Sequence, residues 1–178
     1  MSEKLLRSTG HHDSELRNRT QWSRVRFEIE LTYKGRHQPA PLFEADDEEP
    51  AMTNLTTPSE LMALLEVQFD EVGPTRVTGS VAADERHHQP WGLVHGGLYT
   101  TAIETFATTG AYEAVKDRGQ RAVGVTNITD FVRPHQRGRL NVVASAIHQG
   151  RTQQLWQVEI HRPEDDKLVA RGQRPGGG

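Results

Sequence analysis

The segment from Gly97 to Tyr112 constrains the fold more than any other part of the sequence. It consists of small residues, apolar residues and threonines, and Glu104 is its only charged side chain. A helix on a protein surface shows a charged face, whereas this segment shows none, and the next charged residue is Glu113. We therefore expect a helix that is buried on most sides and packs closely against a sheet.

This helix is bounded by glycines. Gly96 and Gly97 open it, and it is expected to run to about Arg118 because Gly119 suits a left-handed C-terminal cap. Before it, a short helix with Thr57 as N-cap and a hairpin of residues 67–69 and 77–81 are expected. After it, strand patterns cover residues 121–132, 140–149, 153–161 and 167–171. One long helix and about six mostly antiparallel strands predict an α+β domain in which the sheet wraps around the helix.

The first 51 residues differ from the rest in composition. They are dense in charge and hold an acidic patch at residues 44–49, which favours a disordered extension. The alternation from Val25 to Tyr33 is a strand pattern, so a docking strand is the alternative. Because Met52 follows the acidic patch, the extension could also come from an upstream start codon. We assign residues 1–51 to an N-terminal extension and residues 52–178 to the core domain.

Composition excludes several classes of function. The chain has 21 Lys and Arg against 24 Asp and Glu, so no basic field attracts nucleic acid or an anionic membrane. With 0 cysteines it has no disulfide, no thiolate nucleophile and no cysteine metal site. No stretch approaches the ~18 apolar residues of a membrane span. We expect a cytoplasmic protein with no nucleic-acid or membrane partner.

Glu104 is the first candidate for chemistry. Carboxylates are rarely buried unless they are paired or used, so Glu104 is a candidate base or nucleophile. The alternative is an interface residue that forms a salt bridge across a dimer or faces a solvent channel. Thr108 lies four residues further along the same helix face, where its hydroxyl could bond the carboxylate or a water. Taken alone, Thr108 would be a packing residue.

The start of the helix supplies a second candidate. The Gly96 amide lies where helix N–H groups lack partners and the dipole is positive, so it could polarise a carbonyl. Gly96 and Glu104 are separated by roughly 12 Å along one helix at a rise of 1.5 Å per residue. One helix can hardly bring both groups to one carbonyl. We therefore expect a homodimer in which two subunits share each site, with further assembly to a tetramer.

The stretch from His87 to Thr108 resembles a known signature. It reads His-His-Gln-Pro-Trp-Gly-Leu-Val-His-Gly-Gly, followed by Glu104 and Thr108, as in hotdog-fold acyl-CoA thioesterases of the phenylacetate-degradation type. Residues 130–133 and 150–156 are similar to later strands of that family. The resemblance covers residue 52 to the C-terminus and implies a hotdog fold.

The same resemblance implies roles for individual residues. Glu104 would be nucleophile or general base, Gln89 and the Gly96 amide would bind the thioester carbonyl, Thr108 would orient water and His95 would line the site. The other large branch of the family has Asn and Asp in place of Gln89 and Glu104, so this chain resembles the branch that contains 4-hydroxybenzoyl-CoA and dihydroxynaphthoyl-CoA thioesterases. These groups suffice for hydrolysis without a cofactor.

Further residues are candidates for substrate contacts. The candidates that could bind the nucleotide phosphates are Arg133, Arg151 and Thr152. The planar fork of an arginine matches the geometry of phosphate oxygens. The candidates for the acyl side are Trp91, Phe131 and Trp156, with Gly97 leaving room for the substrate. Each arginine taken alone would be a surface residue, and core packing explains the aromatic residues equally well.

Three other functions fit parts of the pattern. A metal hydrolase could use His87, His88 and His95, but no two histidines have the helical spacing of a zinc motif. A dehydratase could pair His88 with the helix carboxylate, and a regulator could bind acyl-CoA without cleaving it. Gln89 and the glycine pair favour hydrolysis of an aromatic or medium-size acyl-CoA, with no metal. The sequence leaves open whether the carrier is coenzyme A or an acyl carrier protein.

Overall fold

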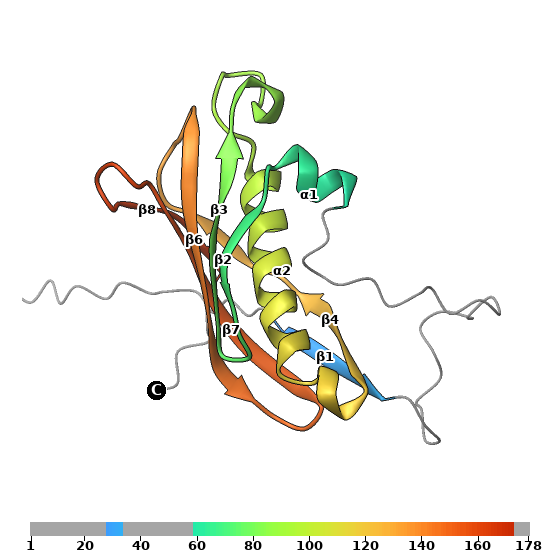
Figure 1. Cartoon of the computed structure of the whole chain (residues 1–178). Coiled ribbons are helices and arrows are strands. Elements are labelled where there is room, and N and C mark those ends of the chain that lie inside the picture. The colour runs from blue at the N-terminus through green and yellow to red at the C-terminus, as the bar shows by residue number, and fades with distance from the viewer. Residues whose placement is uncertain (1–27, 34–58, 173–178) are drawn as a thin grey trace, which may run out of the picture.

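In the computed structural model, one long helix crosses a curved antiparallel sheet (Figure 1). The structure describes residues 28–33 and 59–172, and for residues 28–33 only the backbone. The elements are β1 (Glu28–Tyr33), α1 (Glu60–Leu64), β2 (Gln68–Val72), β3 (Arg76–Ala83), α2 (Gly96–Glu113), β4 (Gln120–Thr126), β5 (Thr129–Phe131), β6 (Gly138–Gln149), β7 (Gln153–His161) and β8 (Leu168–Gly172), with 3-10 turns at Glu85–His87 and Lys116–Arg118.

The sheet has eight strands where about six were expected, although the α+β architecture is confirmed. Its order is β2-β3-β6-β7-β1-β4, and β8 pairs with both β7 and β5. One additional strand arises because the expected strand 121–132 is interrupted at residues 127–128, which separates β4 from β5. The other is β1, which belongs to the N-terminal extension. Every strand pair is antiparallel.

Strand β1 places part of the extension in the sheet. Glu28–Tyr33 pairs with β4 along its length and with β7 at residues 153–155. For these six residues the docking strand holds and the expectation of disorder does not. Most of the remaining extension lies outside the described residues, so the boundary at residue 51 stays a prediction.

Helix α2 buries one face against the sheet. Ala102, Ile103 and Phe106 are fully buried there. Gly110 permits close packing, because a Cβ at this position would lie 2.3 Å from Cη2 of Trp156. Trp156 is 1% exposed, so it is a core residue and does not line a site for an acyl group. This corrects one of the three aromatic candidates.

The opposite side of α2 is only partly covered. Gly97, Thr101, Glu104 and Thr108 are half-buried and follow one another at intervals of three or four residues, which places them on one helix face. The expected burial of Glu104 is therefore partial. Its carboxylate lies on the face away from the sheet, where substrate or another chain can approach.

The helix boundaries differ in detail from the sequence expectations. Helix α2 ends at Glu113, and Gly119 takes the left-handed conformation, with φ 67°, only after a separate 3-10 turn. Helix α1 begins at Glu60, and its cap is Ser59, whose hydroxyl accepts a bond from Met62 N. Thr57 lies outside the described residues. No described helix is long and apolar enough to cross a membrane.

Candidate active site

The carboxylate of Glu104 and the hydroxyl of Thr108 are in contact. Thr108 Oγ1 donates a hydrogen bond of 2.9 Å to Oε1 of Glu104, one turn earlier in α2. No other hydrogen bond or ion pair with a described residue involves this carboxylate. Its second oxygen is thus available to a water, a substrate or a residue of a neighbouring subunit.

The Gly96 amide is available at the start of α2. The next two amides are used, because Gly97 N donates to His95 Nδ1 at 2.9 Å and Leu98 N donates to His95 O at 3.1 Å. The Gly96 N–H donates to no described residue. His95 thus caps the helix while the first amide, at the positive end of the helix dipole, stays free for an acceptor.

The ring of Phe131 lies over Gly96. A Cβ on Gly96 would be 2.7 Å from Cζ of Phe131, so glycine is needed for this approach. Phe131 is 59% exposed, and its ring centroid lies 5.9 Å from that of Tyr99. Burial of Tyr99 raises the pKa of its phenol to about 12, so the ring that Phe131 packs against stays uncharged. Phe131 therefore flanks the free amide, as a residue that walls a substrate site would.

A network of charges supports the loop before α2. Arg86 donates to both carboxylate oxygens of Asp84, at 3.0 and 2.7 Å, and to Glu66 at 2.8 Å. The hydrogen bonds from Arg86 hold the pKa of Asp84 well below its usual range. The buried His87 accepts from Asp84 N through Nδ1 at 3.1 Å, and its Nε2 lies 3.0 Å from Leu64 O. These contacts join the loop to α1.

Gln89 lies at the tip of this loop. Its backbone N donates to Leu93 O and its carbonyl accepts from Gly92 N, which closes a tight turn. The side-chain amide of Gln89 makes no hydrogen bond to a described residue, so it is free to bind a ligand. Trp91, in the same turn, is 83% exposed and packs against no core.

The candidate phosphate ligands lie at two ends of the molecule. Arg133 follows β5, near the start of α2, and donates to Leu168 O at 2.7 Å through Nη1. Arg151 and Thr152 form the exposed turn between β6 and β7, at the end of the sheet near the C-terminus of α2 (Figure 1). One chain therefore brings Arg133 to the end of α2 that carries Gly96, but not the other two.

The described histidines of the loop are engaged in hydrogen bonds within the protein. Among residues 28–33 and 59–172, no three His, Asp or Glu side chains are grouped so that they could hold a metal ion. His88 Nε2 lies 2.7 Å from Gln136 O, so this nitrogen is engaged within the protein.

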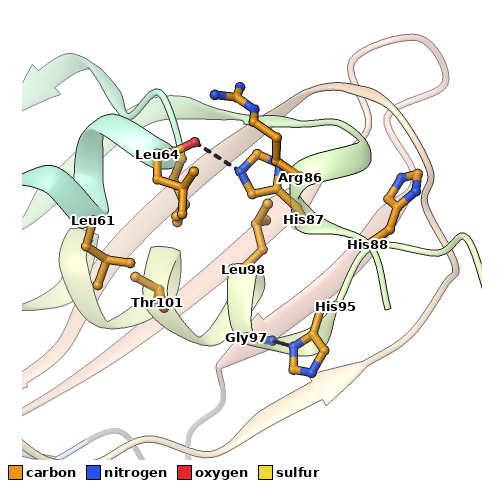
Figure 2. A pocket seen from close by; sticks show the side chains of 10 residues that line it. Leu61, Leu64, Arg86, His87, His88, His95, Gly97, Leu98 and Thr101 are labelled. Carbon is orange, nitrogen blue, oxygen red and sulfur yellow. Dashed lines mark hydrogen bonds between the residues drawn. The ribbon is translucent and has the colours of Figure 1, made fainter. Parts of the chain in front are cut away.

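The sequence interpretation missed a cavity beside the start of α2. Its volume is about 320 Å³, and Figure 2 shows Leu61 and Leu64 of α1 facing Leu98, Thr101 and His95 across it. Leucines three residues apart on a short helix are typical of core residues. In the structure, however, Leu61 is 53% exposed and Leu64 is 42% exposed. Their high exposure is visible only in the structure.

Comparison with known proteins places these features in a family. A profile of the thioesterase superfamily matches residues 92–169. The Mycobacterium tuberculosis protein with the name "Putative esterase Rv1847" is 38% identical over 138 residues, which are 76% of this chain and 92% of that protein. The 1,4-dihydroxy-2-naphthoyl-CoA hydrolase of Escherichia coli is 29% identical over 100 residues, 56% of this chain and 73% of that enzyme.

Solved structures agree. The structure of Rv1847 covers 62% of this chain and 89% of its own, with a TM-score of 0.60 and 38% identity. Thioesterase PA1618 of Pseudomonas aeruginosa gives a TM-score of 0.57 at 32% identity, over 62% of this chain and 81% of its own. These similarities confirm the expected hotdog fold. The chain belongs to the thioesterase superfamily and is a thioester hydrolase.

Proposed function

We propose that the protein hydrolyses acyl-CoA thioesters and that Glu104 acts on the thioester carbonyl. The observation that carries this proposal is the pairing of Glu104 with Thr108 on a helix whose first amide, at Gly96, has no partner among the described residues. The pairing orients the carboxylate, and the free amide provides an oxyanion donor. Relatives named as a 1,4-dihydroxy-2-naphthoyl-CoA hydrolase and a proofreading thioesterase support the substrate class.

The chemistry needs only a few groups. Water adds its oxygen to the carbonyl carbon, the C–S bond breaks, and the products are a carboxylic acid and free thiol. In one route Glu104 takes the proton of that water. In the other, Glu104 attacks the carbonyl carbon and expels the thiolate, and water then hydrolyses the mixed anhydride to the acid and free Glu104. The leaving thiol has a pKa near ~8.5, so it needs little help from an acid. The Gly96 amide and the Gln89 side chain stabilise the oxyanion, and one such donor contributes about 2.7–4 kcal/mol.

We further propose that the working unit is a dimer that shares its sites. Eight residues separate Gly96 from Glu104, or roughly 12 Å along the helix. If two α2 helices pack antiparallel through their half-buried faces, Glu104 meets the partner's Gly96. The same packing brings Arg151 and Thr152, at the C-terminal end of one α2, to the N-terminal end of the other. Arg133 is already there, so three candidate phosphate ligands converge.

Strand β4 supports the same assembly. It ends the described sheet, and its outer edge has no described partner strand. Val123 and Val125 on it are 46% and 45% exposed. An edge strand with exposed apolar residues is normally covered, so a second copy of the chain is the proposed cover. Further assembly to a tetramer and a cytoplasmic location remain predictions.

The test is release of free thiol from a panel of acyl-CoAs. Glu104→Gln should lower kcat by about 10² to 10⁴, because it removes the base or nucleophile while keeping the shape. Glu113→Gln is the matched control, since Glu113 lies on the same helix and pairs with Lys116 on the surface. Near wild-type turnover by the Glu104 variant would refute the assignment.

A further inference from the structure

The cavity between α1 and the start of α2 is lined by leucines on one side and by polar residues of the loop and of α2 on the other. Four leucines contribute to its wall, Leu61, Leu64 and Leu65 from α1 and its C-cap and Leu98 from α2. Leu65 and Leu98 belong to the core, at 3% and 5% exposure, and form the floor. Leu61 and Leu64 each have about half of their surface exposed to solvent. The cavity is therefore a recess whose outer wall, on α1, is apolar and exposed to solvent.

The polar groups around this recess are almost all engaged within the protein. Arg86 is bound to Asp84 and Glu66. His87 is held by Asp84 N and Leu64 O, and His88 by Gln136 O. These bonds hold the polar side chains in place at one side of the recess, whereas Leu61 and Leu64 on the other side stay exposed. The leucine side of the lining therefore favours an uncharged, apolar group.

The recess opens beside the proposed reacting centre. His95 and Gly97 line it, and they are the two neighbours of Gly96, whose amide is the proposed oxyanion donor. Thr101 also lines it, one turn after Gly97 on the half-buried helix face that the proposed partner helix would cover. If the acyl chain of a substrate lies in the recess, its thioester carbonyl lies at the start of the helix.

We infer that this recess binds the acyl group of the substrate, and that Leu61, Leu64 and Thr101 determine which acyl groups are accepted. The inference rests on the proposed function. A volume of about 320 Å³ is roughly ten times the ≈ 30 Å³ share of a water molecule, so it holds about ten non-hydrogen atoms. The substrate class is therefore an acyl-CoA with a compact, uncharged acyl group, such as a benzoyl or octanoyl group.

The experiment fills the recess from its outer wall. Leu61→Trp is suitable because Leu61 is 53% exposed, so a larger side chain can be accommodated without disturbing the core. Glu60→Trp, at the neighbouring exposed position of α1 that does not line the recess, is the matched control. For each protein, kcat/KM is measured for acetyl-, octanoyl-, benzoyl- and palmitoyl-CoA, and binding of S-octyl-CoA, a thioether that cannot be hydrolysed, is measured by calorimetry.

The wild type should prefer octanoyl- and benzoyl-CoA to palmitoyl-CoA. Leu61→Trp should lower kcat/KM for those two by about tenfold or more relative to acetyl-CoA, since a hydrophobic pocket discriminates by about 1–3 kcal/mol. Leu64→Ala, which widens the recess, should raise the relative rate with longer chains. Glu60→Trp should keep the wild-type ratios.

Two outcomes separate this inference from the proposed function. If the wild type releases thiol but Leu61→Trp and Leu64→Ala both keep its chain-length profile, the recess is not the acyl site and the inference is overturned alone. If no acyl-CoA is cleaved but S-octyl-CoA binds and Leu61→Trp weakens that binding, the proposed hydrolysis fails and the recess is supported. Binding that is equal in both proteins overturns the recess as the acyl site.

Discussion

Thr108 Oγ1 donates to Glu104 Oε1 across one turn of α2, at a distance of 2.9 Å. This bond fixes the rotamer of a carboxylate that has no other described partner. It leaves the second oxygen of Glu104 on the face of the helix that is turned away from the sheet.

Replacing Thr108 by Val tests whether this bond serves catalysis. Valine keeps the shape and removes the donor, and a hydrogen bond to a charged group is worth about 1.5–3 kcal/mol, so kcat should fall by roughly 10- to 100-fold. Thr109→Val is the control, because the Thr109 hydroxyl bonds Thr105 O and does not reach Glu104. An unchanged kcat in Thr108→Val would show that the hydrogen bond does not serve catalysis and that Thr108 only packs.

The shared site predicts that activity depends on assembly. Val123→Lys places a charge on the exposed edge strand and should convert the dimer to monomers in sedimentation. Loss of the partner's oxyanion donor should lower kcat by about 10²-fold or more. Asn141→Lys, at an exposed position of β6, should leave both properties unchanged. A monomeric Val123→Lys protein with full activity would show that one chain contains a complete site.

His135 predicts a pH dependence of stability. It is 7% exposed, and its Nε2 has no hydrogen-bond partner in the part of the chain that the structure describes. Burial lowers the pKa of His135 below the ordinary value of 6.5, while the Gly138 backbone and Glu164 favour its protonated form and Arg162 opposes it. The net shift is downward, so the unfolded chain binds the proton more readily than the folded protein does.

The stabilisation that follows is fully present above the unfolded pKa of 6.5 and is lost as the pH falls through that value towards the lower folded one. Urea titrations between about pH 7.5 and 5 should therefore show wild type losing more stability than His135→Gln. Parallel stability curves for the two proteins would mean that His135 titrates alike in both states.

Strand β1 predicts that the extension stabilises the core. A chain that begins at residue 52 loses the strand that pairs with β4 and β7. Each backbone hydrogen bond contributes a net ~0.5–1.5 kcal/mol, so the cost should be at least ~2 kcal/mol. For a protein of this size that lowers Tm by roughly 5 °C or more. A chain that begins at residue 28 retains β1 and is the control; equal Tm values for both truncations would contradict the role of β1.

The sequence predicted the parts of the fold that depend on short-range signals. The absence of charge around Glu104 indicated a packed helix, and Gly119 indicated a left-handed residue after it, which has φ 67°. The spacing of Glu104 and Thr108 predicted their contact, because residues four apart on a helix are neighbours. These features need no knowledge of the rest of the chain.

Other features depend on tertiary contacts that no local pattern contains. The alternation in residues 25–33 lies within a highly charged segment, and only the gap between β7 and β4 decides that it forms a strand. Trp156 was a candidate for the acyl site because exposed and buried tryptophans look alike in a sequence. The recess beside Leu61 arises from the placement of α1, which the sequence pattern does not specify.

The position of β1 also bears on how this chain could be rebuilt. Strands β8 and β1 both run antiparallel to β7, with Gly172 opposite Val158 and Glu28 opposite Leu155. They therefore point in one direction, end to end, and only residues 156 and 157 of β7 lie opposite the interval between them. Joining Gly172 to Glu28 through two residues would make a single continuous strand, so the fold should accept a circular permutation with new termini between β1 and α1.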